Sequence, residues 1–167
     1  MALDEQVLRA ARTWGHTPAA ERAVARFSRL GEHAGVWLAI GTLGATLDVP
    51  RRARWKRATV TVAETYAVNT AVKLLVRRPR PRLAGLPPLT GTPSRLSFPS
   101  AHASTSFAGA LSYGRLGLDR SALLALATAL ACSRLYLGVH YPSDVLAGVL
   151  LGAALAAWRA HGEGGDA

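Results

Sequence analysis

The sequence is poor in cysteine, in acidic side chains and in long apolar runs. One cysteine in 167 residues excludes an intrachain disulfide framework. Only 10 side chains are acidic against 20 that are basic, and 18 of those 20 are arginine, so the formal net charge is +10. This excess indicates an anionic partner, which could be phosphate, a lipid headgroup or nucleic acid.

No apolar run reaches the roughly 20 residues that a helix needs to span a bilayer. The uncharged runs are 34–47, 121–133 and 145–158, with 14, 13 and 14 residues. Each would need flanking residues to cross a membrane, so the buried helices of an alanine-rich soluble bundle stay an alternative. The first 30 residues are charged throughout and contain no visible signal peptide.

The position of the basic residues separates the possible partners. They crowd into 9–29, 51–57 and 77–95, between the uncharged runs. Apolar segments that alternate with basic loops are typical of a membrane protein, whereas a nucleic-acid binder should line one solvated face with its cations. We therefore expect no nucleic-acid partner. The predicted fold is one all-α domain over 1–167, a membrane-embedded helical bundle with about five spanning helices.

Two amphipathic helices are expected in residues 1–30, where apolar side chains share one helical face. They would lie on the membrane surface, or would be ordinary surface helices of a soluble bundle. Thr17 and Pro18 resemble the cap and first position of the second helix. The bundle itself is expected over 34–160, followed by a frayed tail over 161–167. Its predicted spans are 34–48, 57–77, 100–116, 121–138 and 142–160.

The second predicted span carries a polar stripe. Its members recur at every fourth position and should face the interior of the bundle: Thr61, Thr65, Asn69 and Lys73. Glu64 lies off this stripe and is expected to have a structural partner. The segment that follows, 78–100, holds six of the nine prolines and is predicted to be irregular. It could be a lid or a headgroup-selecting loop, or only an exposed connection.

The stretch 133–144 carries groups suited to phosphoryl transfer. His140 and Asp144 are four residues apart, and Pro142 between them is tolerated at the first position of a helix but poorly inside one. We therefore expect a helix to begin near Pro142, with Asp144 in its first turn. The carboxylate could then accept from one imidazole nitrogen and leave the other free to attack. Arg134 lies six residues upstream as a fixed cation.

A second helix start is predicted at Ser100, which would act as its cap. The N–H groups of Ala101 and His102 would then lie unpaired at the helix terminus, an arrangement that binds phosphate. His102 in that first turn could protonate a leaving oxygen.

Helix counting brings these residues together. If five spans alternate in direction, four of their ends emerge on one face of the membrane. Those ends carry Lys73, Arg80, His102, Arg134, His140 and Asp144. Three cations, a helix terminus and two histidines would therefore meet at one surface. Basic residues are nearly balanced between the two faces, so the side on which the site lies stays open.

The pattern resembles the type 2 phosphatidic acid phosphatase superfamily, the lipid phosphate phosphatases. Its motifs are a lysine, six residues and Arg-Pro; Pro-Ser-Gly-His; and Ser-Arg, five residues, His, three residues, Asp. Here they read KLLVRRPRP over 73–81, PSAH over 99–102 and SRLYLGVHYPSD over 133–144. Order and internal spacing agree throughout, with Ala101 in place of the usual glycine.

The resemblance implies a role for each residue. His140 would be the nucleophile that forms a phosphohistidine, Asp144 its orienting carboxylate, and His102 the acid for the leaving alcohol and then the base for water. The phosphate would be bound by Lys73, Arg80, Ser100, Arg134 and the backbone at Ala101. The scheme needs no metal and no cofactor. His16, His33 and His161 have no spaced partners and are not expected to be metal ligands.

The predicted function is that of a multi-pass phosphatase of the cell membrane, with a lipid phosphate as substrate and membrane lipids as partners. The small size resembles bacterial enzymes for polyprenyl carriers such as decaprenylphosphoryl-phosphoribose or undecaprenyl diphosphate. Phosphatidic acid and phosphatidylglycerol phosphate are alternative substrates. An alternative of another class is a basic membrane scaffold without activity. The oligomeric state stays open.

Overall fold

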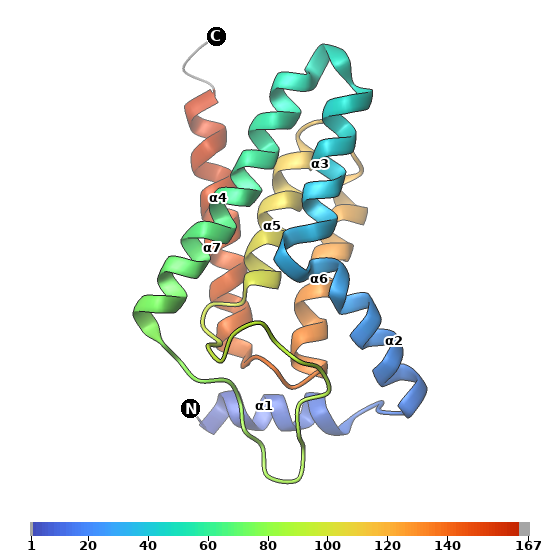
Figure 1. Cartoon of the computed structure of the whole chain (residues 1–167), viewed down its shortest axis with the longest axis vertical. Coiled ribbons are helices and arrows are strands. Elements are labelled where there is room, and N and C mark those ends of the chain that lie inside the picture. The colour runs from blue at the N-terminus through green and yellow to red at the C-terminus, as the bar shows by residue number, and fades with distance from the viewer. Residues whose placement is uncertain (1, 164–167) are drawn as a thin grey trace.

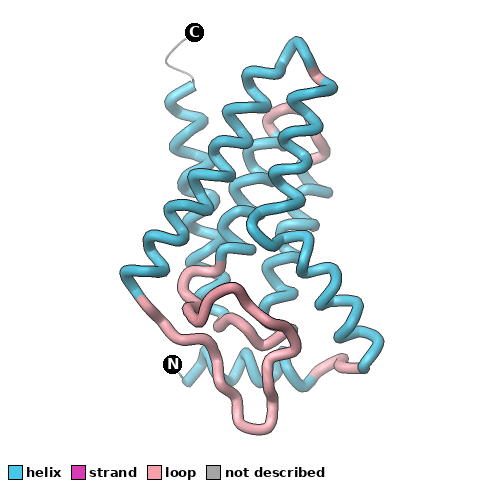
Figure 2. The backbone as a smooth tube through the Cα atoms, viewed as in Figure 1, coloured by secondary structure: helices cyan, strands magenta, loops and turns pink. Residues whose placement is uncertain are grey.

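Helices form all the regular structure in residues 2–163, the part of the chain that the computed structural model describes. No strand occurs in that range, so the all-α prediction is confirmed (Figure 2). The α-helices are α1 (Ala2–Thr13), α2 (Pro18–Ser28), α3 (Gly35–Leu47), α4 (Arg52–Val76), α5 (Ala101–Gly114), α6 (Arg120–Tyr136) and α7 (Pro142–Glu163). Two short 3-10 helices, η1 (Arg29–Ala34) and η2 (Val49–Arg51), lie before α3 and before α4.

The helices α3 to α7 form an elongated bundle with α5 at its centre, and α1 lies across one end (Figure 1). Helix α5 contacts α4, α6 and α7, and 10 of its 14 residues are buried. Its serines, alanines and glycines let the three neighbours approach closely. Two predicted starts are confirmed, because Pro142 begins α7 and Ser100 caps α5 by accepting from Ala103 N.

Some predicted boundaries were wrong. Helix α4 begins at Arg52 rather than at 57, because the reversal after α3 is completed within the short helix η2, which contains Pro50. The tail predicted to fray from 161 is helical to Glu163, and His161 Nδ1 lies 2.8 Å from the Ala157 carbonyl oxygen. The rest of that predicted tail, 164–167, lies outside the described residues.

Within the described residues, one helical segment is long and apolar enough to cross a membrane: Pro142–Gly162. Helix α3 has 13 residues, which at 1.5 Å each cover only about 20 Å of a hydrocarbon core about 30 Å thick. The five predicted spans are therefore not confirmed and stay a prediction. The outer surface nevertheless exposes large apolar side chains along the bundle: Leu43, Leu47, Val60, Leu74, Leu75, Leu146, Leu150 and Trp158.

The polar stripe of α4 faces inward, as predicted. Thr61, Thr65 and Asn69 are all buried, and the last two are fully so. Glu64 lies on another face of α4 and pairs with Arg159 of α7, which gives the expected structural partner. The inward stripe leads directly to Lys73 near the end of the helix.

Helix α1 is held by the fully buried Leu8 and by a buried arginine, while the face that carries Leu3 and Trp14 stays uncovered. Arg12 is 4% exposed and donates to the Pro87 carbonyl oxygen at 2.7 Å. Leu3 and Trp14, by contrast, are 72% and 88% exposed. An apolar face that the protein leaves uncovered is the arrangement expected of an interfacial helix.

Glycines set the distance between α5 and α7. A Cβ atom at Gly152 would lie 2.1 Å from the Ser104 carbonyl oxygen, and one at Gly148 would lie 2.5 Å from that of Ser100. These are backbone atoms at the centre of the bundle, so they cannot move aside as a flexible side chain would.

We expect Gly152→Ala to destabilise the protein by about 1–3 kcal/mol, because the added methyl group forces α5 and α7 apart. Thermal unfolding in detergent would measure this change. Gly162→Ala on the same helix is the matched control, since a Cβ there meets nothing within 4 Å. Equal stability of the two variants would contradict this account of the packing.

Candidate active site

A cavity of about 140 Å³ lies at the end of the bundle where α4 and α6 end and α5 begins. It is lined by η1, the end of α4, the start of α5, the end of α6 and the loop before α7. Six of the predicted site residues line it: Lys73, Arg80, Ala101, His102, Arg134 and His140. The other two, Ser100 and Asp144, are fully buried beside it. The structure thus brings the predicted residues together, while their chemical roles stay predictions.

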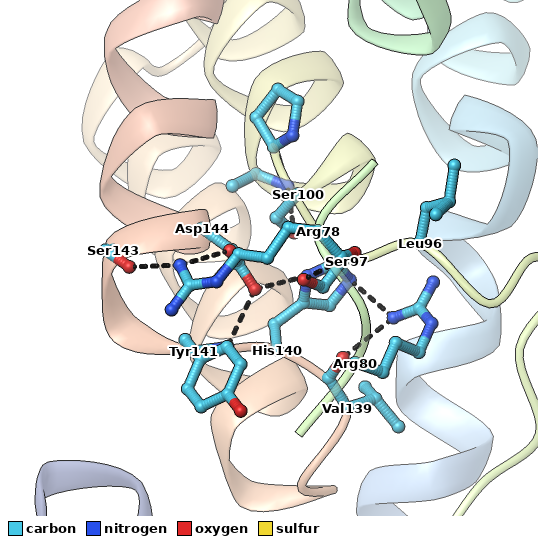
Figure 3. Close-up of polar contacts among 12 residues, drawn as sticks. Arg78, Arg80, Leu96, Ser97, Ser100, Val139, His140, Tyr141, Ser143 and Asp144 are labelled. Atoms are coloured by element: carbon cyan, nitrogen blue, oxygen red, sulfur yellow. Dashed lines mark hydrogen bonds and ion pairs between the residues drawn. The ribbon is translucent and has the colours of Figure 1, made fainter. Parts of the chain in front are cut away.

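His140 and Asp144 form a pair with a defined direction. His140 Nδ1 lies 3.5 Å from Asp144 Oδ2, and the backbone N–H of Tyr141 donates to the same oxygen at 2.9 Å. On the other side of the ring, Nε2 lies 3.0 Å from Arg80 Nη1 (Figure 3). The carboxylate of Asp144 favours the proton on Nδ1 of His140. Nε2 therefore carries the lone pair, and it faces the cations.

Burial, together with the charges of Arg80, Arg134 and Lys73, lowers the pKa of His140 to about 3, although the hydrogen bond with Asp144 opposes them. At neutral pH the imidazole of the free protein is therefore uncharged. An uncharged imidazole is the form that can act as a nucleophile.

His102 is fixed by a segment that the sequence analysis did not connect with the site. Its Nε2 donates to the Ser28 carbonyl oxygen at 3.0 Å, because a carbonyl can only accept. That bond leaves Nδ1 as the nitrogen available for exchange of a proton. Gly31 packs against the same ring, since a Cβ at that position would lie 2.6 Å from His102 Cδ2. Neither Ser28 nor Gly31 lies in a recognisable motif.

Backbone carbonyls hold two of the cations, and all but that of Val139 belong to the proline-rich loop, 78–100. Lys73 Nζ lies 3.1–3.4 Å from three carbonyl oxygens, those of Leu96, Ser97 and Pro99. Arg80 donates through Nε to the Ser94 carbonyl oxygen at 2.8 Å and through Nη1 to that of Val139 at 2.7 Å. The loop is thus folded back against the site. Among the described residues neither Lys73 nor Arg80 forms an ion pair with a carboxylate, so both charges remain available to an anion.

The polar atoms around the cavity are incompletely satisfied. In the described part of the chain, four buried side-chain nitrogen or oxygen atoms have no hydrogen-bond partner, and two of them, Asn69 Oδ1 and Arg134 Nε, belong to cavity-lining residues and are not explained by a neighbouring charge. A third, His140 Nδ1, lies 3.5 Å from Asp144 Oδ2, the carboxylate oxygen that orients it. Buried polar atoms normally have partners, so such a cluster indicates a place for a ligand. With three cations around it, the ligand favoured is an anion.

Arg78 connects the carboxylate of Asp144 to helix α1. Its Nη1 donates to Asp144 Oδ1 and its Nη2 to Asp4 Oδ2, each at 2.9 Å (Figure 3 shows the first contact). Ser143 completes the link by donating through its hydroxyl and its N–H to Asp4. The sequence analysis missed both Arg78 and Asp4. The sequence signal for Arg78 was its position two residues before Arg80. Nothing in the sequence around Asp4 indicated a role in the site.

The pairing with α1 is expected to depend on pH. Burial raises the pKa of Asp4, but hydrogen bonds from Ser143 and Arg78 outweigh it and leave the pKa below its ordinary value of 3.8. The carboxylate therefore stabilises the fold above about pH 4, and this contribution is lost as the pH falls through the lower folded-state pKa. Asp4→Asn should unfold at a lower temperature than the parent from pH 5 to 8, with a smaller difference near pH 3.

Glu5→Gln is the matched control for this experiment, because Glu5 is half-exposed and, in the part of the chain that the structure describes, pairs with Arg9 on the same helix. It should change the unfolding temperature little at any of these pH values. If the difference between the parent and Asp4→Asn did not shrink in acid, the carboxylate of Asp4 would not be the stabilising group.

Comparison with known proteins gives concordant results. Residues 54–164 match the sequence model of the PAP2 superfamily. A protein of Mycobacterium tuberculosis (strain ATCC 25618 / H37Rv) called decaprenylphosphoryl-5-phosphoribose phosphatase is 45% identical over 131 residues, which are 78% of this chain and 73% of that protein.

Two crystal structures share the fold. A transmembrane PAP2-type phosphatidylglycerolphosphate phosphatase from Bacillus subtilis superposes with a TM-score of 0.81 at 22% identity, over 99% of this chain and 87% of that one. LpxE of Aquifex aeolicus superposes with a TM-score of 0.80 at 23% identity, over 96% of both chains.

Proposed function

The chain belongs to the PAP2 superfamily, and from this premise we propose that it is a multi-pass membrane phosphatase acting on a polyprenyl-linked lipid phosphate. The substrate class that we favour is a polyprenyl phosphate carrying a sugar phosphate, from which the terminal phosphomonoester is removed. The name of the Mycobacterium tuberculosis relative supports this class. The observation that carries the proposal is the position of His140 Nε2, beside three cations and backed by a buried carboxylate.

In the proposed reaction the phosphate dianion binds between Lys73, Arg80 and Arg134. Nε2 of His140 attacks phosphorus, so a P–N bond forms while the bond to the leaving oxygen breaks, and a protonated His102 gives that oxygen its proton. His102 then accepts a proton from water as the water attacks phosphorus. The P–N bond breaks, inorganic phosphate leaves and both histidines return to their starting forms.

Arg80 has two tasks in this scheme. In the free protein its Nη1 lies 3.0 Å from His140 Nε2, in the place that phosphorus must approach. Burial lowers the pKa of Arg80 to about 10, so the side chain stays charged at neutral pH. We propose that Arg80 turns from the imidazole to the phosphate when substrate binds. The lone pair of Nε2 is then released where phosphorus lies.

A lipid substrate and a membrane location agree with the outer surface. Exposed apolar side chains run along α3, α4 and α7, and α1 keeps Leu3 and Trp14 uncovered. A substrate with a long isoprenoid tail could lie against this surface with its headgroup at the cavity. Phosphatidic acid and phosphatidylglycerol phosphate could approach in the same way, so they are the substrates to compare.

The test is release of phosphate by purified protein in detergent with a chelator present. Four substrates would be compared: decaprenylphosphoryl-5-phosphoribose, undecaprenyl diphosphate, phosphatidic acid and phosphatidylglycerol phosphate. We expect the highest kcat/KM for the first. A protein that acted as a scaffold would release no phosphate from any of them. A clear preference for phosphatidic acid would overturn the proposed substrate class while leaving the reaction type intact.

A further inference from the structure

One wall of the catalytic cavity carries a carboxylate that the reaction does not use. Glu32, His33 and Tyr66 line the same cavity as His102 and the cations. Glu32 is half-buried and, among the described residues, its carboxylate has no hydrogen bond or ion pair, although its charge acts on Arg134. His33 Nδ1 and the Tyr66 hydroxyl are hydrogen-bonded at 2.9 Å. Glu32 and His33 lie outside residues 54–164, the segment matched by the superfamily.

The backbone that presents Glu32 is strained. His33 and Ala34 both have left-handed conformations, with φ of 50° and 61°, a region that residues other than glycine seldom adopt. Two such residues in succession cost free energy and persist only where the surroundings hold them, which is typical of ligand sites. Ser28 and Gly31 hold this turn against His102 from one side, and the bond to Tyr66 holds it from the other.

The charge of Glu32 is unexpected in a site for phosphate. A carboxylate near a bound dianion repels it and cannot donate a hydrogen bond to it. Balancing the charge of Arg134 is the simplest alternative role for Glu32. That role would need neither a strained turn nor a position on the cavity wall, and it would weaken the binding of phosphate. Carboxylates do, however, accept strongly from hydroxyl groups.

We propose that Glu32, together with His33 and Tyr66, forms a subsite for the hydroxyl groups of a sugar that carries the phosphate to be cleaved. This inference rests on the proposed function and narrows it. The carboxylate accepts from the sugar hydroxyls, while the paired imidazole and phenol offer further hydrogen-bonding groups. Hydrogen bonds from free sugar hydroxyls to Glu32 offset the repulsion between Glu32 and phosphate. Phosphatidic acid gives no such compensation, because its phosphate is attached directly to diacylglycerol.

The test is Glu32→Gln, a change that removes the charge and keeps the shape. On decaprenylphosphoryl-5-phosphoribose we expect kcat/KM to fall at least about tenfold, because a charged acceptor for hydroxyls is lost. On phosphatidic acid we expect kcat/KM to rise, because a charge that repels the phosphate is gone. Two soluble substrates test the hydroxyl groups alone. With Glu32→Gln, kcat/KM should fall on methyl ribofuranoside 5-phosphate and rise on its 2,3-dideoxy analogue, which differs only in lacking the two hydroxyls.

Glu21→Gln is the matched control, since Glu21 lies on α2 with His16 as its partner and does not line the cavity. A fall of equal size on all substrates with Glu32→Gln would assign Glu32 a structural role and overturn the inference. A rise of equal size on all would mean that Glu32 only repels phosphate, and would overturn it also. If the parent hydrolysed phosphatidic acid but not the sugar phosphate, the proposed substrate class itself would have failed.

Discussion

Replacing His140 with glutamine is expected to lower kcat by roughly 10⁶-fold, the size of loss seen when a covalent nucleophile is removed. Glutamine keeps a polar side chain in the pocket but offers no lone pair that could form a phosphorylated intermediate. Rapid quenching with a phosphate-labelled substrate should show an acid-labile phosphoenzyme in the parent and none in the variant. Phosphate release by His140→Gln at the parent rate would exclude the proposed mechanism.

Asp144→Asn provides the comparison that separates attack from orientation. The carboxylate acts through Nδ1 and does not touch phosphorus, so its loss should be about a hundredfold less severe than the loss of His140. The variant should still form the phosphoenzyme, more slowly. If both variants lost the same activity, the imidazole and the carboxylate could not be assigned different roles.

Gly31→Val is expected to lower kcat by about 10²-fold, although Gly31 lies outside every motif. A side chain at this position meets the His102 ring, whose Cδ2 would be 2.6 Å from the new Cβ. The ring must move, and a displacement of about 1 Å in a catalytic group can cost that factor. The rate of breakdown of a preformed phosphoenzyme should fall with the same factor, because His102 serves both steps.

Gly35→Ala tests whether this effect is specific to Gly31. Gly35 lies four residues further along, at the start of α3, and a Cβ there would only make an ordinary contact of 3.6 Å with the Leu30 carbonyl oxygen. Its kcat should stay within about twofold of the parent. If both variants lost the same amount of kcat, the segment around 31 would simply be intolerant of substitution. The positioning of His102 by Gly31 would then be contradicted.

The site was predictable where chemistry follows local sequence. Pro142 and Ser100 mark helix starts by rules that depend on one or two residues, and both are where the sequence placed them. The alternation of helices then brought Lys73, Arg134 and His140 to one end without any contact being known. The number of membrane spans was not decided in the same way, because each uncharged run is shorter than the roughly 20 residues that a spanning helix needs.

The parts that were missed depend on contacts between distant residues. Asp4 meets Arg78 across 74 positions, and Ser28 meets His102 across the same number. The turn that presents Glu32 has left-handed residues that are not glycines, so no composition rule marks it. His33 was considered only as a metal ligand, so its position on the cavity wall beside Tyr66 was not predicted.

The link from α1 through Arg78 to Asp144 has a practical consequence for handling the protein. Asp4 lies within the first turns of α1 and pairs with Arg78, which contacts Asp144. A purification tag fused to the amino terminus would therefore be attached a few residues from this link. A truncation that removed α1 would leave Arg78 with one carboxylate instead of two. Helix α7 ends at the opposite end of the bundle (Figure 1), so the carboxyl terminus is the better site for a tag.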